Sequence, residues 1–230
     1  MLIIFLFYRE TLIDDPLGFM ATLIPMYLFF LLLLIPMMVF HEISHGMVAL
    51  KLGDDTAKMM GRLSWNPLVH LDRAGTLMFL IVGIGRAKPV PINPYCLNMD
   101  PRKGMAIVAA AGPLSNFLVA ILCAALFRLD ILSLPSTTQA QFADLPADVI
   151  LTVLRINVLL AVFNMFPVPP FDGFRIAVGM LPDEQARSLA SIERYAPQII
   201  MIFFIAVLFT GFLWTLLDFV TNAFLGQNYF

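Results

Sequence analysis

The chain has 230 residues, of which 60% are hydrophobic and only 13% are charged, and its mean hydropathy is +0.87. This composition exceeds what the core of a water-soluble protein of this size requires, so it excludes a soluble globular protein and indicates an integral membrane protein. The formal net charge of -2 does not indicate a partner, and no basic tract interleaved with aromatic residues predicts binding to nucleic acid.

Four apolar stretches are long enough to cross the hydrocarbon core, which takes about 20 residues of helix. In chain order they are residues 17–50, 103–127, 148–166 and 196–225. We therefore expect an all-α polytopic protein with about four to six transmembrane helices. Residues 1–230 would form a single integral membrane domain.

The connection between the first and second spans has a different pattern. Gly, Pro and Asn residues separate short apolar runs, such as those from Gly61 to Trp65 and from Gly75 to Phe79. Short apolar runs bounded by turn residues are typical of β-strands. The pattern predicts a small membrane-associated β-sheet between these two spans.

The first span ends in the motif HExxH, at His41 to His45. Residues i and i+4 of a helix share one face, so His41 and His45 can bind one metal ion together. Glu42 beside them can take a proton from a water that the metal activates. Alone, the two histidines could also be a chance pair on a helix. A catalytic zinc site takes three protein ligands and leaves a position for water, so a third ligand must be found.

The third ligand has two candidates. His70 is the only other histidine, whereas Asp172 follows a proline-rich segment that begins at Asn164 and interrupts the third span. Irregular backbone at membrane depth is tolerated only where protein or a water-filled cavity covers it, and a carboxylate there needs a compensating partner such as a metal ion. These arguments favour Asp172, and leave His70 as a structural or membrane-surface histidine that could line the entrance of the site.

The basic residues are distributed unevenly between the two sides of the membrane. Most fall in the connections after the first and third spans, whereas the opposite side has only Arg9 and Arg128. By the positive-inside rule the richer side is cytoplasmic. We expect an active site near the cytoplasmic face, with Asp172 delivered to the same face as His45 and with both termini on the opposite side.

Two motifs together carry a family resemblance. HExxH at His41 to His45 and the pattern NxxPxPxxDG at Asn164 to Gly173 resemble the two signatures of the site-2 protease family of intramembrane zinc metalloproteases. The segments from Gly61 to Asp72 and from Arg86 to Pro91 resemble the compact branch of that family, which has no PDZ or CBS domains. The resemblance extends from about Leu17 to Gly179.

The resemblance implies one zinc ion per chain, held by His41, His45 and Asp172, with Glu42 as the base that activates water. Asn164 would hydrogen-bond the substrate or the oxyanion that develops on its carbonyl group. The implied reaction is hydrolysis of peptide bonds in transmembrane segments of substrate proteins, in regulated intramembrane proteolysis. The implied partners are a transmembrane protein substrate and the lipid bilayer.

Two other functions remain open. In a divalent-metal transporter the same His and Asp side chains would be transport ligands, and polar residues would continue across the membrane on both sides of the site; the sequence clusters them near one face. A catalytically inert homologue usually lacks a ligand or the base, and none is missing here.

Asn116, in the second span, has two interpretations. Among small residues in a transmembrane helix, an asparagine typically makes an interhelical hydrogen bond. The alternative is a polar contact with substrate, a role that His70 could share. In the last span, Pro197 and Gly211 could permit bending, so this span is a candidate gate for substrate entry.

Overall fold

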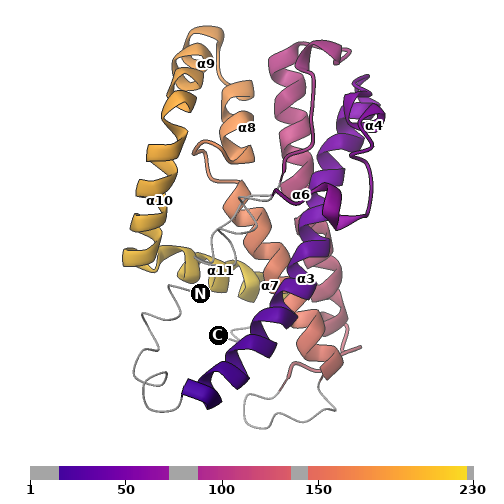
Figure 1. The fold of residues 1–230 in the computed structure, drawn as a ribbon, viewed down its shortest axis with the longest axis vertical. Helices are drawn as coiled ribbons and strands as arrows, with labels where there is room; N and C mark the ends of the chain where they lie inside the picture. Colours follow the sequence, from indigo (N-terminus) through magenta and orange to yellow (C-terminus); the bar gives the residue numbers. More distant parts are fainter. Residues whose placement is uncertain (1–15, 73–87, 136–144, 227–230) are drawn as a thin grey trace.

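The fold is built around three long helices that run in alternating directions (Figure 1). The computed structural model describes residues 16–72, 88–135 and 145–226. Helix α6 is central, because it packs against α3, α7 and α8. The helices are α3 (Pro16–Lys51), α4 (Thr56–Met59), α6 (Pro101–Arg128), α7 (Leu145–Asn164), α8 (Asp172–Met180), α9 (Asp183–Ala190), α10 (Ala196–Thr210) and α11 (Phe212–Leu225), with 3-10 turns η1 (Pro67–Val69), η2 (Pro94–Cys96) and η4 (Ser191–Tyr195).

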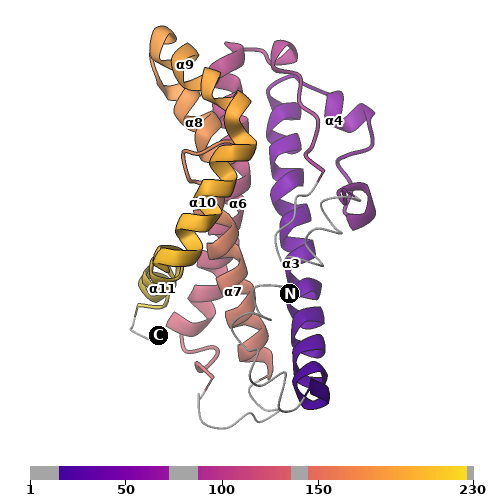
Figure 2. The same cartoon turned by 60° about the vertical axis from the view of Figure 1, so that its left-hand side comes forward.

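Four helical segments of the described chain are long and apolar enough to cross a membrane. Large apolar side chains such as Leu32, Leu118 and Ile202 are exposed on them, which suits contact with lipid rather than with water. In Figure 2, α8, α9 and α10 lie along one side of the bundle, and α3 with α4 lies along the other. The candidate spans are Tyr27–Lys51, Pro101–Arg128, Leu145–Asn164 and Asp183–Val207.

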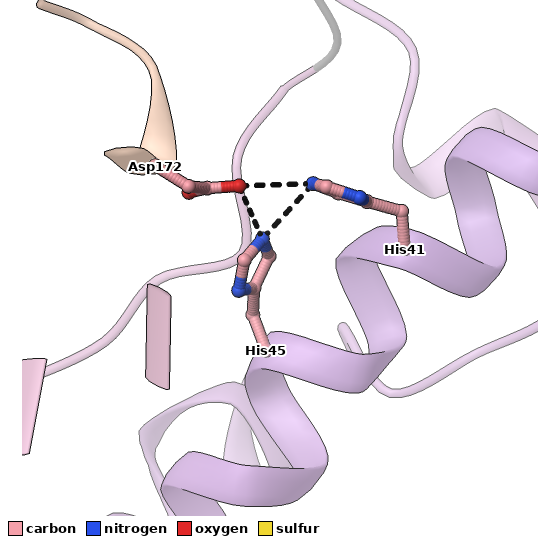
Figure 3. A group of neighbouring side chains, drawn as sticks. All are labelled: His41, His45 and Asp172. Carbon is pink, nitrogen blue, oxygen red and sulfur yellow. Dashed lines mark hydrogen bonds and ion pairs between the residues drawn. The ribbon is translucent and has the colours of Figure 1, made fainter. Parts of the chain in front are cut away.

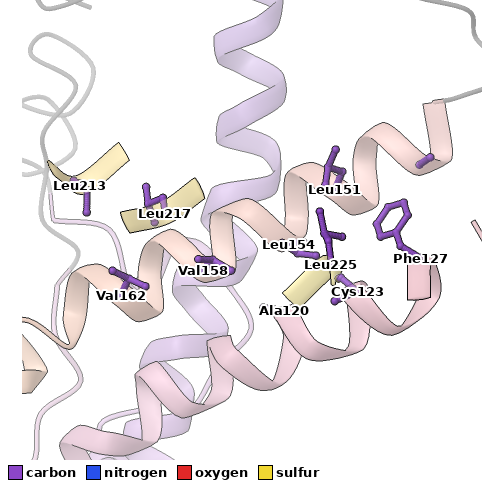
Figure 4. Close-up of a cluster of buried hydrophobic side chains, with 12 residues drawn as sticks. Ala120, Cys123, Phe127, Leu151, Leu154, Val158, Val162, Leu213, Leu217 and Leu225 are labelled. Carbon is purple, nitrogen blue, oxygen red and sulfur yellow. The ribbon is translucent and has the colours of Figure 1, made fainter. Parts of the chain in front are cut away.

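A hydrophobic core joins α6, α7 and α11 (Figure 4). Leu154 and Val158 of α7 are fully buried in it, and Leu213 and Leu217 bring α11 onto the same core. An ion pair between Arg155 of α7 and Asp218 of α11, at 3.7 Å, adds little because both side chains are about half exposed. Apolar packing therefore attaches α11 to the bundle.

The last predicted span, residues 196–225, forms two helices that meet at Gly211. Gly211 has φ +63° and ψ 2°, in the left-handed region, and it ends α10 and precedes α11. This conformation terminates a right-handed helix, so α11 turns away from α10 and runs across the bundle from the C-terminal end of α10 (Figure 1). Neither α10 nor α11 alone covers the whole of the predicted span.

The predicted β-sheet is wrong. The described parts of the connection, residues 52–72 and 88–100, contain α4, η1 and η2 and no strand, and the run from Gly75 to Phe79 lies outside the described residues. Asn66 and Asn93 each cap a 3-10 turn by accepting a backbone N–H two residues on. Prolines at the first position of both turns lack the N–H that a ladder needs. Local capping thus satisfies backbone groups that a sheet would have paired.

Replacing Gly211 by alanine should destabilise the protein. Nothing lies within 4 Å of a Cβ added at this position, so the cost comes from the left-handed backbone alone and is about 1–2 kcal/mol. Thermal unfolding in detergent measures it, with Gly211→Asn as the matched control because asparagine tolerates this conformation better. Equal melting temperatures for Gly211→Ala and wild type would contradict the strain argument.

Candidate metal centre

Three potential ligand atoms converge between α3 and α8 (Figure 3). The Nε2 atoms of His41 and His45 are 3.1 Å apart, and Asp172 Oδ2 lies 3.1 Å from the first and 3.2 Å from the second. Both histidines are buried and Asp172 is largely so. The structure therefore brings together the three side chains that the sequence motifs singled out.

Helix periodicity and a glycine place these side chains. His41 and His45 are one turn apart on α3, so their rings share a face. Asp172 is the first residue of α8, which follows the irregular segment after α7. A Cβ on the next residue, Gly173, would overlap the backbone carbonyl of Met165, so only glycine lets the chain return this closely and present Asp172 to α3.

The second nitrogen of each ring fixes which nitrogen carries the proton. His45 Nδ1 lies 2.7 Å from the backbone carbonyl of Val108, which can only accept a hydrogen bond, so Nδ1 is the protonated nitrogen of the neutral ring. His41 Nδ1 lies 2.6 Å from Asn116 Oδ1, which likewise accepts. Both Nε2 atoms are then unprotonated and face Asp172.

This arrangement fits a zinc ion. When both rings are neutral and protonated on Nδ1, two imidazole lone pairs and a carboxylate oxygen point at one another, and a metal ion at the centre relieves their mutual repulsion. Tetrahedral zinc with bonds of about 2.0–2.1 Å keeps neighbouring donors about 3.3 Å apart, close to the 3.1–3.2 Å that separate His41, His45 and Asp172. Zinc-binding histidines also usually donate a hydrogen bond from the ring nitrogen that does not bind the metal, as Nδ1 does in both rings here.

Gly112 of α6 leaves the space that such an ion needs. A Cβ built on Gly112 would overlap His45 Nε2 and lie 2.5 Å from His41 Nε2. Val108, Gly112 and Asn116 are spaced four residues apart, so one buried face of α6 supplies the acceptor behind His45, the opening beside both rings and the acceptor behind His41.

The charge of Asp172 suits a metal ligand. Burial disfavours the ionised carboxyl, but rings of His41 and His45 that carry a proton on Nε2 donate hydrogen bonds to it, and these bonds and the positive charge of the rings outweigh burial and hold the pKa of Asp172 below its usual range. The carboxyl is consequently ionised at neutral pH. An ionised carboxylate with two neutral imidazoles is a donor set that catalytic zinc sites use.

Glu42 is held by a separate segment of the chain, residues 88–93. Its Oε2 accepts a hydrogen bond from the backbone N–H of Val90 at 3.0 Å. The buried Arg62 donates to the carbonyl oxygens of Lys88 and Pro89, at 2.7 and 3.2 Å. This segment is therefore anchored to the protein where it meets Glu42.

The far end of the same segment is anchored by Asp54, whose Oδ2 accepts the N–H of Asn93 at 2.7 Å. Burial raises the pKa of Asp54, but hydrogen bonds from Thr56 and Asn93 prevail and lower it below its usual value. Asp54 thus remains an ionised acceptor at neutral pH.

The other predicted site residues make different contacts. Asn164 ends α7, and its Nδ2 donates to the carbonyl of Leu160, which leaves its second amide hydrogen available. His70 Nε2 donates to the carbonyl of Ser64, and His70 shares with Glu42 the wall of a cavity of about 20 Å³, enough for one water. Asn116 is fully buried behind His41.

Several contributors to the site carry no motif of their own. The carbonyl of Val108 and the N–H of Val90 are backbone groups, which any residue type would supply. Asn157 of α7 belongs to neither motif. It is fully buried, and its Oδ1 accepts a hydrogen bond from Asn116 Nδ2 at 2.8 Å. An asparagine within an apolar helix is the one sequence signal that could have drawn attention to it.

Aromatic contacts join α10 to the segment that delivers Asp172. Phe203 of α10 lies 5.5 Å from Phe171 and 5.0 Å from Phe166, measured between ring centroids. Phe171 in turn contacts Phe163 of α7 at 4.5 Å. Side chains at this spacing form edge-to-face pairs, so α10 touches the site region through aromatic rings.

Comparisons with known proteins agree with the site. The family model described as "Peptidase family M50" matches residues 29–142. YwhC of Bacillus subtilis is 34% identical over 184 residues, covering 77% of this chain and 80% of that protein. Rip2 of Mycobacterium tuberculosis is 25% identical over 181 residues, covering 76% and 65%. MJ0611 of Methanocaldococcus jannaschii is 30% identical over 138 residues, covering 60% and 63%.

The names of these three relatives describe them as candidate zinc metalloproteases. No solved structure gives a significant match to the chain. The predicted resemblance, the zinc cofactor and the membrane location are confirmed by the family match, the relatives and the four apolar helices. The chain belongs to peptidase family M50, the site-2 protease family of membrane zinc metallopeptidases.

Proposed function

We propose that the chain is an intramembrane protease that hydrolyses peptide bonds in the transmembrane segments of substrate proteins. The observation that carries this proposal is the convergence of His41 Nε2, His45 Nε2 and Asp172 Oδ2 at 3.1–3.2 Å from one another. These three side chains hold one zinc ion per chain. Residues 1–230 act as a single membrane domain, in which α3 is both an apolar candidate span and the source of two ligands.

Each residue of the centre has a defined task. A zinc ion held by His41, His45 and Asp172 would supply a Lewis acid for the substrate carbonyl and for a water. Glu42 takes the proton of that attacking water and later passes it to the leaving nitrogen, while the N–H of Val90 steadies its carboxylate. Asn164 donates its free amide hydrogen to the carbonyl oxygen as negative charge develops there.

The site and two long connections lie at the same end of the bundle. The connection after α3 and the segment with α8 and α9 both emerge there (Figure 1). These connections hold most of the basic residues, so the positive-inside rule places this end on the cytoplasmic side and the termini on the opposite side. Cleavage there would release the cytosolic part of a substrate, as in regulated intramembrane proteolysis.

Substrate entry past α10 agrees with the way this helix is attached. Within the described chain, α10 contacts the Asp172 segment through Phe203 and its aromatic neighbours, and it ends at the left-handed Gly211. A helix held by a few side chains can move more readily than one packed along its length. We infer that α10 is the gate.

The first prediction separates the base from the ligands. Glu42→Gln should retain zinc and lower the turnover of a model transmembrane substrate by at least about 100-fold, because general-base catalysis typically contributes 10²–10⁴-fold. Asp172→Ala should lose both zinc and cleavage. Zinc content and cleavage are measured in detergent or liposomes. Normal cleavage by Glu42→Gln would overturn the mechanism, and would leave metal transport or a structural role of the site to be tested.

A second prediction uses the opening at Gly112. Gly112→Ala should lower zinc affinity by at least about 10-fold, because its methyl group would occupy the space beside both ring nitrogens. The matched control is Leu114→Ala on the same helix, whose side chain is 62% exposed and outside the site. Zinc binding is measured by competition with a chelator. Wild-type affinity in Gly112→Ala would show that the ion binds elsewhere.

The topology can be tested with the native cysteines. Cys96, exposed in η2 at the site end, should resist a membrane-impermeant maleimide in intact cells and react in inverted membrane vesicles. Cys123 is buried in α6 and should stay unlabelled in both preparations. Cys96→Ser supplies the blank. Labelling of Cys96 in intact cells would reverse the proposed orientation.

A further inference from the structure

Asn157 is a fully buried polar side chain of α7, two residues after the half-exposed Arg155. It lies in α7, whereas the two histidines lie in α3, and neither sequence motif includes it. An amide buried at this depth costs free energy unless its hydrogen bonds are satisfied. Its two hydrogen bonds therefore indicate why the structure places it there.

Those bonds form a directed chain that ends at a ligand. Asn157 Nδ2 donates to the carbonyl of Val153 at 2.8 Å, and Asn157 Oδ1 accepts from Asn116 Nδ2 at 2.8 Å. Asn116 Oδ1 lies 2.6 Å from His41 Nδ1. Because the Val153 carbonyl can only accept, Asn157 must turn its nitrogen toward it and its oxygen toward Asn116. Asn116 must then turn its own oxygen toward His41.

We propose that Asn157 is a positioning residue that sets the protonated nitrogen of His41, and thereby the zinc affinity of the site. The inference rests on the proposed function, in which His41 is a zinc ligand. With Asn116 oriented by Asn157, His41 carries its proton on Nδ1 and offers the Nε2 lone pair to the metal. His45 needs no such relay, because the Val108 carbonyl fixes it directly.

Without Asn157, the opposite orientation is competitive. Asn116 could turn its amide nitrogen to His41 Nδ1, which would shift the ring proton to Nε2. His41 Nε2 lies 3.1 Å from Asp172 Oδ2, so a proton on Nε2 would form a hydrogen bond that stabilises the wrong tautomer. A ring protonated on Nε2 cannot bind zinc through that atom. Asn157 removes this ambiguity, because reversing it would set its oxygen against the Val153 carbonyl in a buried site.

The decisive experiment compares Asn157→Leu with Asn157→Asp in the full-length chain purified in detergent. Leucine removes the relay at similar volume, and the zinc dissociation constant should rise about 10–100-fold, the usual effect of losing an outer partner of a metal ligand. A buried, neutral aspartic acid donates its O–H to Val153 and accepts from Asn116. Asn157→Asp should therefore retain far more affinity than Asn157→Leu. Zinc is titrated by competition with a chromophoric chelator.

Nitrogen-15 NMR of the histidines gives a readout that a merely structural role would not move. The chain has three histidines, and the metal-free protein at a pH where the rings are neutral contains its own references. His45 is protonated on Nδ1 and His70 on Nε2, as their carbonyl partners require. His41 should match the pattern of His45 in wild type and shift toward that of His70 in Asn157→Leu.

A control for lost stability is Val158→Ala, next to Asn157 and equally buried but outside the relay. It should weaken the fold without changing zinc affinity. The proposal is overturned if Asn157→Leu binds zinc like wild type, if it loses no more affinity than Val158→Ala, or if His41 keeps its Nδ1 proton. If instead His41→Ala binds zinc like wild type, the proposed function fails and not only the relay.

Discussion

The constraint on which the rest of the structure depends is the meeting of three electron-pair donors in an apolar bundle. His41, His45 and Asp172 approach to 3.1–3.2 Å with no hydrogen among them once both Nδ1 atoms are protonated. Such a group needs positive charge at its centre, and it offers both ring lone pairs to a metal ion only if each ring keeps its proton on Nδ1. The surrounding helices can be understood as the means of meeting these two conditions.

One face of helix α6 contributes to both conditions. Val108, Gly112 and Asn116 recur every four residues, and each acts through a different property: a carbonyl oxygen, a missing side chain and an amide oxygen. Small residues let α6 approach α3 closely enough for this, which is also how transmembrane helices pack without a hydrophobic driving force. Helix packing and metal binding therefore constrain the same residues.

The sequence pointed to the three side chains that converge, because they have restricted chemistry at helical spacing or at the end of a proline-interrupted span. It could not predict the Val108 carbonyl or the Val90 N–H, because backbone groups leave no trace in residue identity. The sheet was predicted wrongly because apolar runs between turn residues resemble strands, whereas Asn66 and Asn93 cap local turns instead. The break at Gly211 was visible only as a residue that permits bending.

The proposed base and the proposed ligands are held by different parts of the chain, and this separation bears on the proposed mechanism. The ligands belong to α3 and α8 and are oriented from α6 and α7. Glu42 shares α3 with two of them, but its carboxylate is fixed by residues 88–93, which the buried Arg62 and Asp54 anchor at either end. A displacement of that segment would misplace the base and leave the donor triangle intact. In the proposed mechanism, metal affinity and catalytic rate are therefore set by different contacts, although one helical turn carries residues that serve both.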